Sequence, residues 1–400
     1  MPDSAGAIFR VFLHLGLTSF GGPIAHLGYF RREFVERRQW LSESAYADLV
    51  ALCQFLPGPA SSQVGFAVGL SRGGLAGGLA AWAGFTLPSA VALMAFALGA
   101  GAISGPAGLG ALHGLKVVAV AVVAQVVWGM ARALCPDRER ASIAVLATLV
   151  VFFAASSAGQ IGAIVLGGAL GLWLCREATA SPAGALPVTV SRAVGGACLA
   201  VFLLLLAGLP VAVRLGAGHA VAVFEAFYRA GALVFGGGHV VLPLLQAAVV
   251  PPGWVSEGAF LAGYGAAQAV PGPLFTFAAY LGAVKAPVPN GVAGAVLCLV
   301  AIFLPGLLVL TGALPFWSAF RRRIWAQSAM RGVNAAVVGI LLAALYSPVW
   351  TGAVLGPPDF ALALVAFVLL AVWQAPPWMV VALSAAAGAA LGVMGIGGAG

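Results

Sequence analysis

The stretch CQFLPGPASSQ, Cys53 to Gln63, interrupts a long apolar run with proline, glycine and proline. A second stretch, AQAVPGPLFTF, repeats this interruption at Ala267 to Phe277. Because proline lacks an amide donor and clashes with the preceding turn, Pro-Gly-Pro ends a helix. In hydrocarbon the freed backbone groups are costly unless protein or water covers them. The two stretches therefore predict two interrupted helices around a covered polar region.

The composition predicts an integral membrane protein. The chain has 400 residues, of which 62% are hydrophobic and 8% charged, and its mean hydropathy is +1.06. Soluble domains carry about 25% charged residues. The apolar runs lack the alternation of barrel strands, so we expect an all-α polytopic membrane protein. The net charge of +8 lies in short loops, which favours the positive-inside rule over binding of nucleic acid.

Thirteen apolar segments are expected, and a linker rich in Pro, Ala, Ser and Thr divides the chain almost in half. The segments run near 8–30, 45–70, 74–101, 112–133, 142–156, 160–175, 194–213, 218–244, 258–284, 291–314, 332–347, 359–374 and 378–397. The expected organisation is an N-terminal transport repeat at 1–175, a linker at 176–193, a connecting transmembrane helix at 194–213 and a C-terminal inverted transport repeat at 214–400.

The two halves repeat in five ordered places, and the distance between the copies changes by only a few residues. The pairs are FGGPIAH (20–26) with FGGGHVV (235–241), WLSESAY (40–46) with WVSEGAF (254–260), QFLPGP (54–59) with QAVPGP (268–273), FTLPS (85–89) with FLPG (303–306), and HGLKVVAVA (113–121) with RGVNAAVVG (331–339). Basic loops in one half face neutral loops in the other, as RREFVERRQ (31–39) faces LLQAAVVPPG (244–253). The pattern predicts two inverted-topology repeats with broken or re-entrant helices.

The repeat inverts whether the first two segments of each half span the bilayer or re-enter, because an odd number of spans separates equivalent points in both schemes. We favour re-entrant hairpins, since they place Arg72 on the same side as Arg31 to Arg38. This scheme puts the N-terminus in the cytoplasm and the C-terminus outside.

The two Pro-Gly-Pro stretches are the candidate substrate site. We call Pro57, Gly58 and Pro59 the first break, and Pro271, Gly272 and Pro273 the second break. A helix that restarts after such a break presents unpaired amides and the positive end of its dipole, which suits an anion. Hydroxyls on the first turn add donors, namely Ser61, Ser62 and Thr276. The alternative is a structural kink, but duplicated breaks favour a transport site.

Further candidates lie close to these breaks or inside other apolar segments. Glycine pairs Gly21-Gly22 and Gly236-Gly237 allow close approach of a ligand or of another helix, with His26 and His239 nearby. Gln54 and Gln268 align three residues before each break, where they line a pore or bond across helices. Lys116, whose repeat partner is Asn334, either binds an anion or extends to the interface.

Asp48, Glu225 and His26 are candidates for proton coupling. Glu225 and Arg229 share a helix face at i,i+4 spacing, so pairing at the interface is the alternative for that acid. The five cysteines are scattered and show no metal-binding or disulfide spacing. We expect no cofactor, no metal and no enzyme, because Walker, Rossmann, HExxH and GxSxG motifs are absent from the sequence. Transport then uses an ion gradient or runs downhill.

The ordered motifs FGGPIAHLGYFRREFVERRQWLSESAYADLVALCQFLPGPASSQ and FGGGHVVLPLLQ…WVSEGAFLAGYGAAQAVPGP resemble the chromate ion transporter family in its two-domain fused form. The resemblance implies an inner-membrane protein that exports chromate and confers resistance, with the breaks and glycine pairs as signature positions. It implies chromate or a related tetrahedral oxyanion, and the bilayer, as partners; a homodimer is compatible with the sequence. Ala269 and Val270 replace Phe55 and Leu56 in the second copy, which makes the halves unequal.

Several alternatives stay open at this point. Transport by alternating access is favoured, and a sulfate-like oxyanion transporter or an anion channel on the same fold are the alternatives. The residues themselves predict an anion carrier without naming chromate, because chromate and sulfate share charge and shape. An intramembrane enzyme would need a convergent acid–base set near a break, and a scaffold would leave the duplicated breaks unexplained.

Overall fold

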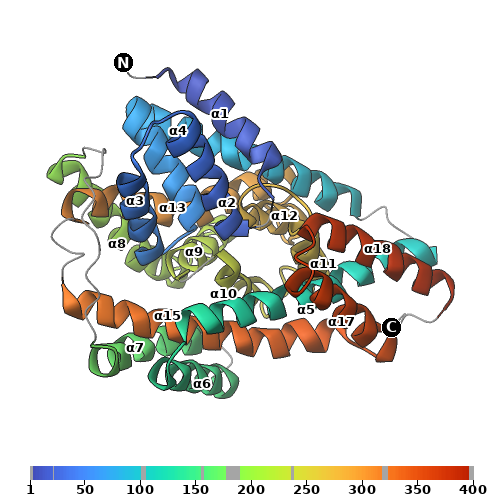
Figure 1. Cartoon of the computed structure of the whole chain (residues 1–400). Helices are drawn as coiled ribbons and strands as arrows, with labels where there is room; N and C mark the ends of the chain where they lie inside the picture. Colours follow the sequence, from blue (N-terminus) through green and yellow to red (C-terminus); the bar gives the residue numbers. More distant parts are fainter. Residues whose placement is uncertain are drawn as a thin grey trace.

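The chain is helical throughout the residues that the computed structural model describes, namely 3–20, 22–100, 105–154, 157–176, 190–235, 238–317 and 323–395 (Figure 1). Within these residues no strand occurs, which confirms the all-α prediction. The helices long and apolar enough to cross a membrane are Ala60–Gly99, Gly105–Leu134, Arg192–Arg214, Gly291–Phe316 and Ile324–Ala353. The predicted breaks divide the segments near 8–30, 45–70, 218–244 and 258–284 into shorter helices.

The first half begins with short helices that stop in the middle of the predicted segments. Its elements are α1 (Ala5–Thr18), α2 (Gly22–Arg31), the π-helix η1 (Arg32–Arg37), α3 (Glu43–Phe55) and α4 (Ala60–Ala100). Ser4 and Ser42 cap α1 and α3 by accepting amide hydrogens from Ala7 and Ala45. With 14, 10 and 13 residues, α1, α2 and α3 are each too short for a hydrocarbon core of about 30 Å.

These short helices return to the side from which they started. Phe12 of α1 lies beside Phe30 of α2, with ring centroids 5.9 Å apart, so the chain reverses at the first glycine pair. The start and the end of this region meet again at one surface. Asp3 forms an ion pair with Arg72 at 2.8 Å, and the guanidinium of Arg72 lies 5.2 Å from the Trp40 ring. The broken segments of the first half therefore re-enter, as we predicted.

The described α4 contains two helices that join at a sharp turn. Gly73 and Gly74 have non-helical angles there, and Gly74 has a positive φ of 61°. Beyond the turn the second part of α4 runs back along the first part. Their backbones are close, because a Cβ atom at Gly69 would lie 2.4 Å from the carbonyl oxygen of Gly77. The first part completes the re-entrant hairpin, and the second part crosses the bilayer.

The second half repeats this arrangement. Its broken segments are α9 (His219–Ala232), η2 (Gly238–Val240), α10 (Val241–Val249), α11 (Glu257–Ala267), η3 (Leu274–Thr276) and α12 (Phe277–Val284). His219 lies against Trp254 with ring centroids 5.0 Å apart. Nζ of Lys285 is 3.4 Å from Nε2 of His219. Trp254 is the repeat partner of Trp40, so the start, middle and end of these hairpins also meet at one surface.

The remaining helices separate the two hairpin groups and surround them. They are α5 (Gly105–Leu134), α6 (Arg138–Phe153), α7 (Ser157–Leu174), α8 (Arg192–Arg214), α13 (Gly291–Ala313) with η4 (Leu314–Phe316), α15 (Ile324–Ala344), η5 (Leu345–Trp350), α16 (Thr351–Ala353), α17 (Pro357–Ala371) and α18 (Pro377–Val393). The second part of α4 and helices α5, α6, α7 and α8 lie between the groups along the chain. This odd number of crossings places the two groups in opposite orientations, as expected for inverted repeats.

The outer helices pack through small residues. A Cβ atom at Gly114 of α5 would lie 2.2 Å from the carbonyl oxygen of Ser384 in α18. Gly332 of α15 approaches Gly167 of α7 in the same way, at 2.0 Å. Such contacts are typical of membrane helices, where small residues let backbones meet. Figure 1 shows α5 and α15 running along one side of the hairpin groups, with α17 and α18 packed on α5.

Candidate functional site

Each Pro-Gly-Pro break is hydrogen-bonded to the other half of the protein. The amide of Gly58 donates to the carbonyl oxygen of Val234 at 2.8 Å, and the amide of Gly272 donates to that of Ser19 at 2.9 Å. Val234 and Ser19 each directly precede a Phe-Gly-Gly sequence. Gly58 and Gly272 have φ angles of +120° and +96°, which suit only glycine. Each Pro-Gly-Pro break therefore meets the residues that precede the glycine pair of the opposite half.

Each break also packs against a helix of the opposite half. A Cβ atom at Gly58 would lie 3.0 Å from Cα of Gly306 in α13. A Cβ atom at Gly272 would lie 2.9 Å from Oγ of Ser89 in α4. Ser89 and Gly306 end the repeated FTLPS and FLPG motifs. Each break is therefore held by the long helix of the opposite half, with no space for a side chain.

Four helical segments start at these breaks. Two start at the glycine pairs, at Gly22 and Gly238, and two start after the prolines, at Ala60 and Leu274. The first amides of a helix have no partner within it, and they carry the positive end of its dipole. The hydrogen bonds from Gly58 and Gly272 occupy the carbonyl oxygens of Val234 and Ser19, whose partial negative charge would otherwise repel an anion. Amide donors for an anion at these helix starts, which the sequence predicts, stay a prediction.

A cavity of about 410 Å³ opens beside the second break. Its lining is Gly22, Val122, Gln125, Val126, Trp128, Gly129, Met130, Gly238, His239, Ala267, Gln268, Val270, Gly272, Leu274, Ala371 and Pro377. This set joins four of the predicted site residues, Gly22, His239, Gln268 and Gly272. The cavity has room for an oxyanion and water, since one water needs only about 10–15 Å³. No Lys, Arg, Asp or Glu occurs in the lining.

Three polar side chains reach this cavity. Nε2 of Gln268 is shielded from solvent and has no hydrogen-bond partner within the described part of the chain. Gln125 donates from Nε2 to the carbonyl oxygen of Leu370 at 3.1 Å, which fixes its amide. Nδ1 of His239 lies 2.9 Å from the hydroxyl of Tyr264. A buried amide without a partner is costly, so Gln268 has an unused donor at the cavity.

The first break is closed by a side chain. Nε2 of Gln63 donates to the carbonyl oxygens of Pro57 and Gly306, both at 2.9 Å, and Gln63 is fully buried. Phe277 occupies the matching position of the second half. Sequence reasoning missed Gln63 and Gln125, because neither has a polar partner in the other repeat. The two breaks are therefore unequal, and Pro57, Gly58 and Pro59 do not line the cavity.

Two of the three hydroxyls predicted to bind an anion have partners elsewhere in the described structure. Oγ of Ser61 lies 3.4 Å from Nδ1 of His26, and Thr276 donates to the carbonyl oxygen of Pro273 at 2.7 Å. Ser62 is buried, and its hydroxyl has no partner in the described residues. None of these side chains lines the cavity. Pro271 and Pro273, on either side of Gly272, do not line it either.

Three other predicted site residues lie outside the cavity. Gln54, at the end of α3, is exposed, although its repeat partner Gln268 lines the cavity. Lys116 precedes Gln125 on α5 by nine residues, about 13.5 Å along the helix, and its Nζ lies beside Gly258. Asn334 lies on α15, where its Oδ1 is buried and without a partner among the described residues. The structure does not bring Lys116 and Asn334 to the breaks.

The candidate acids have partners. Glu225 accepts from Nε of Arg229 at 2.6 Å, which confirms the predicted i,i+4 pairing. Asp48 is buried and accepts from Nε1 of Trp317 at 3.4 Å. His26 is also buried, and its Nε2 has no partner in the described structure. The predicted residues Gly21, Gly236 and Gly237 lie outside the described residues.

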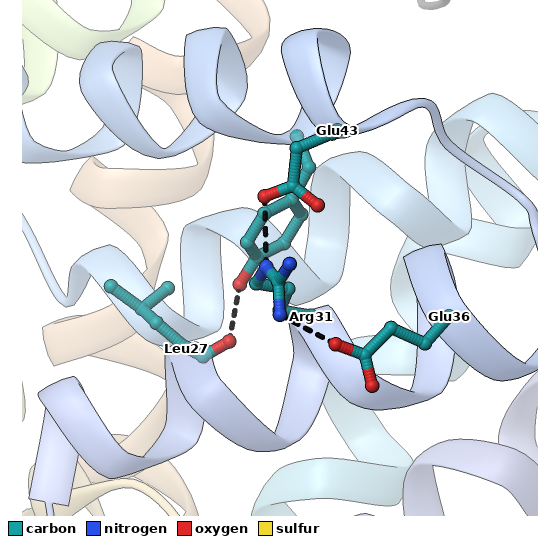
Figure 2. Close-up of polar contacts among 5 residues, drawn as sticks. Leu27, Arg31, Glu36 and Glu43 are labelled. Atoms are coloured by element: carbon teal, nitrogen blue, oxygen red, sulfur yellow. Dashed lines mark hydrogen bonds and ion pairs between the residues drawn. The ribbon is translucent and has the colours of Figure 1, made fainter.

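A polar network ties the ends of the first hairpins together (Figure 2). Arg31 donates from Nε to Glu43 at 2.8 Å and from Nη1 to Glu36 at 2.5 Å. The hydroxyl of Tyr46 donates to the carbonyl oxygen of Leu27 at 2.6 Å. These contacts join α2 to α3 at the surface that carries the arginines, so the two re-entrant hairpins are fixed at the end opposite to the breaks.

Comparisons with known proteins agree with the repeated architecture. The family model described as chromate transporter matches residues 6–172 and again residues 221–389. The chromate transport protein of Pseudomonas aeruginosa is 30% identical over 349 residues, which cover 85% of this chain and 80% of that protein. The probable chromate transport protein of Synechococcus elongatus is 27% identical over 350 residues, or 84% and 82% of the two chains.

The chromate transport protein of Cupriavidus metallidurans is 25% identical over 336 residues, which cover 84% of this chain and 80% of that protein. No solved structure matches the chain. The family model covers most of the chain and matches it once in each half, in the regions that contain the re-entrant hairpins and the breaks. The chain therefore belongs to the chromate transporter family, as a multi-pass membrane protein with two copies of the family's domain.

Proposed function

We propose that the protein exports chromate, or a closely related tetrahedral oxyanion, by holding it at the second break. The observation that carries this proposal is the cavity that joins Gly22, Gln268 and Gly272, because it gathers residues from two of the duplicated motifs and from both halves of the chain. The names of the relatives supply chromate as the substrate class. On this proposal the protein is a transporter and catalyses no covalent chemistry.

Binding of the dianion relies on neutral donors. The cavity lining carries no Lys or Arg, so backbone amides at the helix starts and the free amide of Gln268 supply the attraction. Hydrogen bonds to a charged group contribute about 1.5–3 kcal/mol each, so a few of them hold an anion well. Weak net charge in the site also allows release, which a carrier needs.

Alternating access uses the inverted halves. The bonds from Gly58 to Val234 and from Gly272 to Ser19 mark the surface between the two hairpin groups. Rocking of one group against the other about this surface exposes the cavity first to one side and then to the other. Of the three candidates for proton coupling, Asp48 and Glu225 already have partners, so we assign coupling to His26, whose Nε2 has none among the described residues.

Charge distribution supports an inner-membrane orientation with a cytoplasmic N-terminus. On the predicted topology, the helix ends on the side of Asp3 and Trp40 carry Arg31, Arg32, Arg37, Arg38, Arg72, Arg132, Arg138, Arg140, Arg176, Arg192 and Arg323. Helix ends on the opposite side carry Arg214 and Lys285. Basic residues gather on the cytoplasmic side of membrane proteins. Chromate would then leave the cell in the direction from the arginine-rich side to the side of Lys285.

Accumulation of chromate in expressing cells tests the function. Cells with the wild-type protein are expected to accumulate less chromate than cells with the Gly272→Val variant at equal membrane levels. An uncoupler should remove the difference if transport is driven by an ion gradient, whereas a channel would instead show rapid flux that does not depend on a counter-ion. Competition by excess sulfate would instead favour a carrier for sulfate-like oxyanions. Equal accumulation with both proteins, each shown to be folded, would overturn the proposal.

A further inference from the structure

His239 has a hydrogen-bond partner on one side of its ring and the cavity on the other. Nδ1 lies 2.9 Å from the hydroxyl of Tyr264. Nε2 faces the start of α2, because a Cβ atom at Gly22 would lie 3.6 Å from it, and Gly22 and His239 both line the cavity. Tyr264 is completely buried in α11. The imidazole therefore connects a buried hydroxyl to the proposed oxyanion site.

The buried hydroxyl decides which nitrogen of the imidazole carries the proton. A tyrosine hydroxyl has one proton to donate, and a buried one needs an acceptor. Nδ1 of His239 is its hydrogen-bond partner in the described structure. When the hydroxyl donates to Nδ1, the neutral imidazole must carry its hydrogen on Nε2. Protonation of Nδ1 would leave the tyrosine hydrogen without an acceptor in a buried place, which is unfavourable.

We propose that Tyr264 is a positioning residue that holds His239 as a neutral Nε2–H donor, and that this donor binds the oxyanion in the cavity. The inference rests on the proposed function and extends it to one atom. Gly22, at the start of α2, lines the same cavity, so the Nε2–H group lies beside that helix start. The cavity gains a directed donor without gaining a net charge.

This arrangement belongs to the second half alone. The aligned positions of the first half hold Ile24 and Val50, which are apolar and cannot form such a pair. The first break is also the one that Gln63 closes. The positioned histidine and the open cavity therefore both belong to the second break, which gives the duplicated scaffold a single oxyanion site.

Nitrogen NMR of histidine tests the tautomer directly. In protein labelled with ¹⁵N-histidine, the His239 signals are assigned by comparison with the His239→Gln variant. At neutral pH, Nε2 should show the shift of an N–H nitrogen and Nδ1 that of a bare acceptor. Addition of sodium chromate should move the Nε2 signal most. A hydrogen on Nδ1, a doubly protonated ring, or an unchanged Nε2 signal with saturating chromate would overturn the inference.

Transport by variants tests the role of Tyr264. Tyr264→Phe should lower chromate transport on the order of tenfold, since it releases the tautomer while keeping the ring. In a His239→Gln background the same change should have no further effect, because no imidazole remains to be oriented. Tyr280→Phe is the matched control: its hydroxyl donates to the carbonyl oxygen of Ala259 at 2.9 Å, away from His239.

The outcomes separate this inference from the proposed function. Equal losses for Tyr264→Phe in both backgrounds would mean that Tyr264 only packs the core, and would overturn the positioning role. If the wild-type protein transports no chromate, the proposed function fails. In that case the NMR spectrum still tests the tautomer, and sodium sulfate, titrated as a second probe, shows whether Nε2 binds any tetrahedral dianion.

Discussion

The amide of Gly272 donates a hydrogen bond of 2.9 Å to the carbonyl oxygen of Ser19, which lies in the opposite half of the chain. The equivalent bond of the other repeat, 2.8 Å long, runs from the amide of Gly58 to the carbonyl oxygen of Val234. Each half thus completes the interrupted backbone of the other, which solves the problem of exposing polar backbone within a membrane. The two breaks differ in what lies beside them, because Gln63 fills the space at the first break and a cavity opens at the second.

Gly272→Val should reduce chromate transport by on the order of tenfold or more, because a β-branched residue at positive φ is strained. Its Cβ atom would also lie 2.9 Å from Oγ of Ser89. Transport into proteoliposomes that contain the purified variant measures this effect. Gly208→Val is the control, since a Cβ atom there has no neighbour within 4 Å. Retained flux in the Gly272 variant would place the anion elsewhere.

The aligned glutamines provide a matched comparison. Gln268→Ala removes an amide that lines the cavity and has no other partner in the described structure, so chromate affinity should fall about tenfold to a hundredfold. Gln54→Ala should change it little, because Gln54 is exposed outside the cavity. Binding of chromate to the purified proteins, followed by titration calorimetry, compares the two variants. Equal losses of affinity would contradict the asymmetry between the breaks.

Gln63→Leu should destabilise the protein by about 1–3 kcal/mol, because the carbonyl oxygens of Pro57 and Gly306 both lose their buried donor. Thermal unfolding in detergent measures the change. Gln160→Leu serves as the comparison, since Gln160 donates to a single carbonyl oxygen among the described residues, that of Pro243 at 3.2 Å. The Gln63 variant should unfold at the lower temperature. The opposite order would show that Gln63 does not hold the first break.

The contacts of Glu33 with Arg37 and Arg38 predict that the stability of the protein depends on pH. Burial opposes its ionisation, but the hydrogen bonds and charges of Arg38 and Arg37 outweigh burial and lower its pKa below the ordinary 4.5. A lowered pKa in the folded state stabilises the protein above pH 4.5, and the stabilisation is lost as the pH falls further. The difference in thermal stability between the wild type and Glu33→Gln should therefore be present at neutral pH and vanish in acid. Glu139→Gln, which removes a carboxylate from an exposed contact of 3.8 Å with Arg138, is measured beside it as a second surface variant.

Sequence reasoning predicted the architecture because its signals are local or duplicated. Pro-Gly-Pro cannot continue a helix, so both breaks were predicted at the residues where helices end. The hairpins followed from the position of Arg72, which lies beside Trp40 and Asp3 in the structure. The spacing of Glu225 and Arg229 predicted their ion pair. The two matches of the family model confirm the repeat.

The site itself was only partly predictable, because it depends on contacts between residues far apart in the chain. Alignment treated Gln54 and Gln268 as equivalent, but only Gln268 lines the cavity. Lys116 is a cation inside an apolar segment, which predicted a role in anion binding. It lies outside the cavity, nine residues before Gln125 on α5. Gln125, on the same helix, carried no signal beyond its polarity. Which side of a helix faces a cavity is set by packing, which the repeat alone does not specify.

The position of chromium in a structure determined with chromate tests the central claim most directly. The anomalous signal of chromium identifies the ion without ambiguity. The account predicts one site per chain, inside the cavity and within hydrogen-bond distance of Nε2 of His239 or Nε2 of Gln268. Chromium at the first break, beside Lys116, or at no ordered position in protein that transports chromate would contradict it.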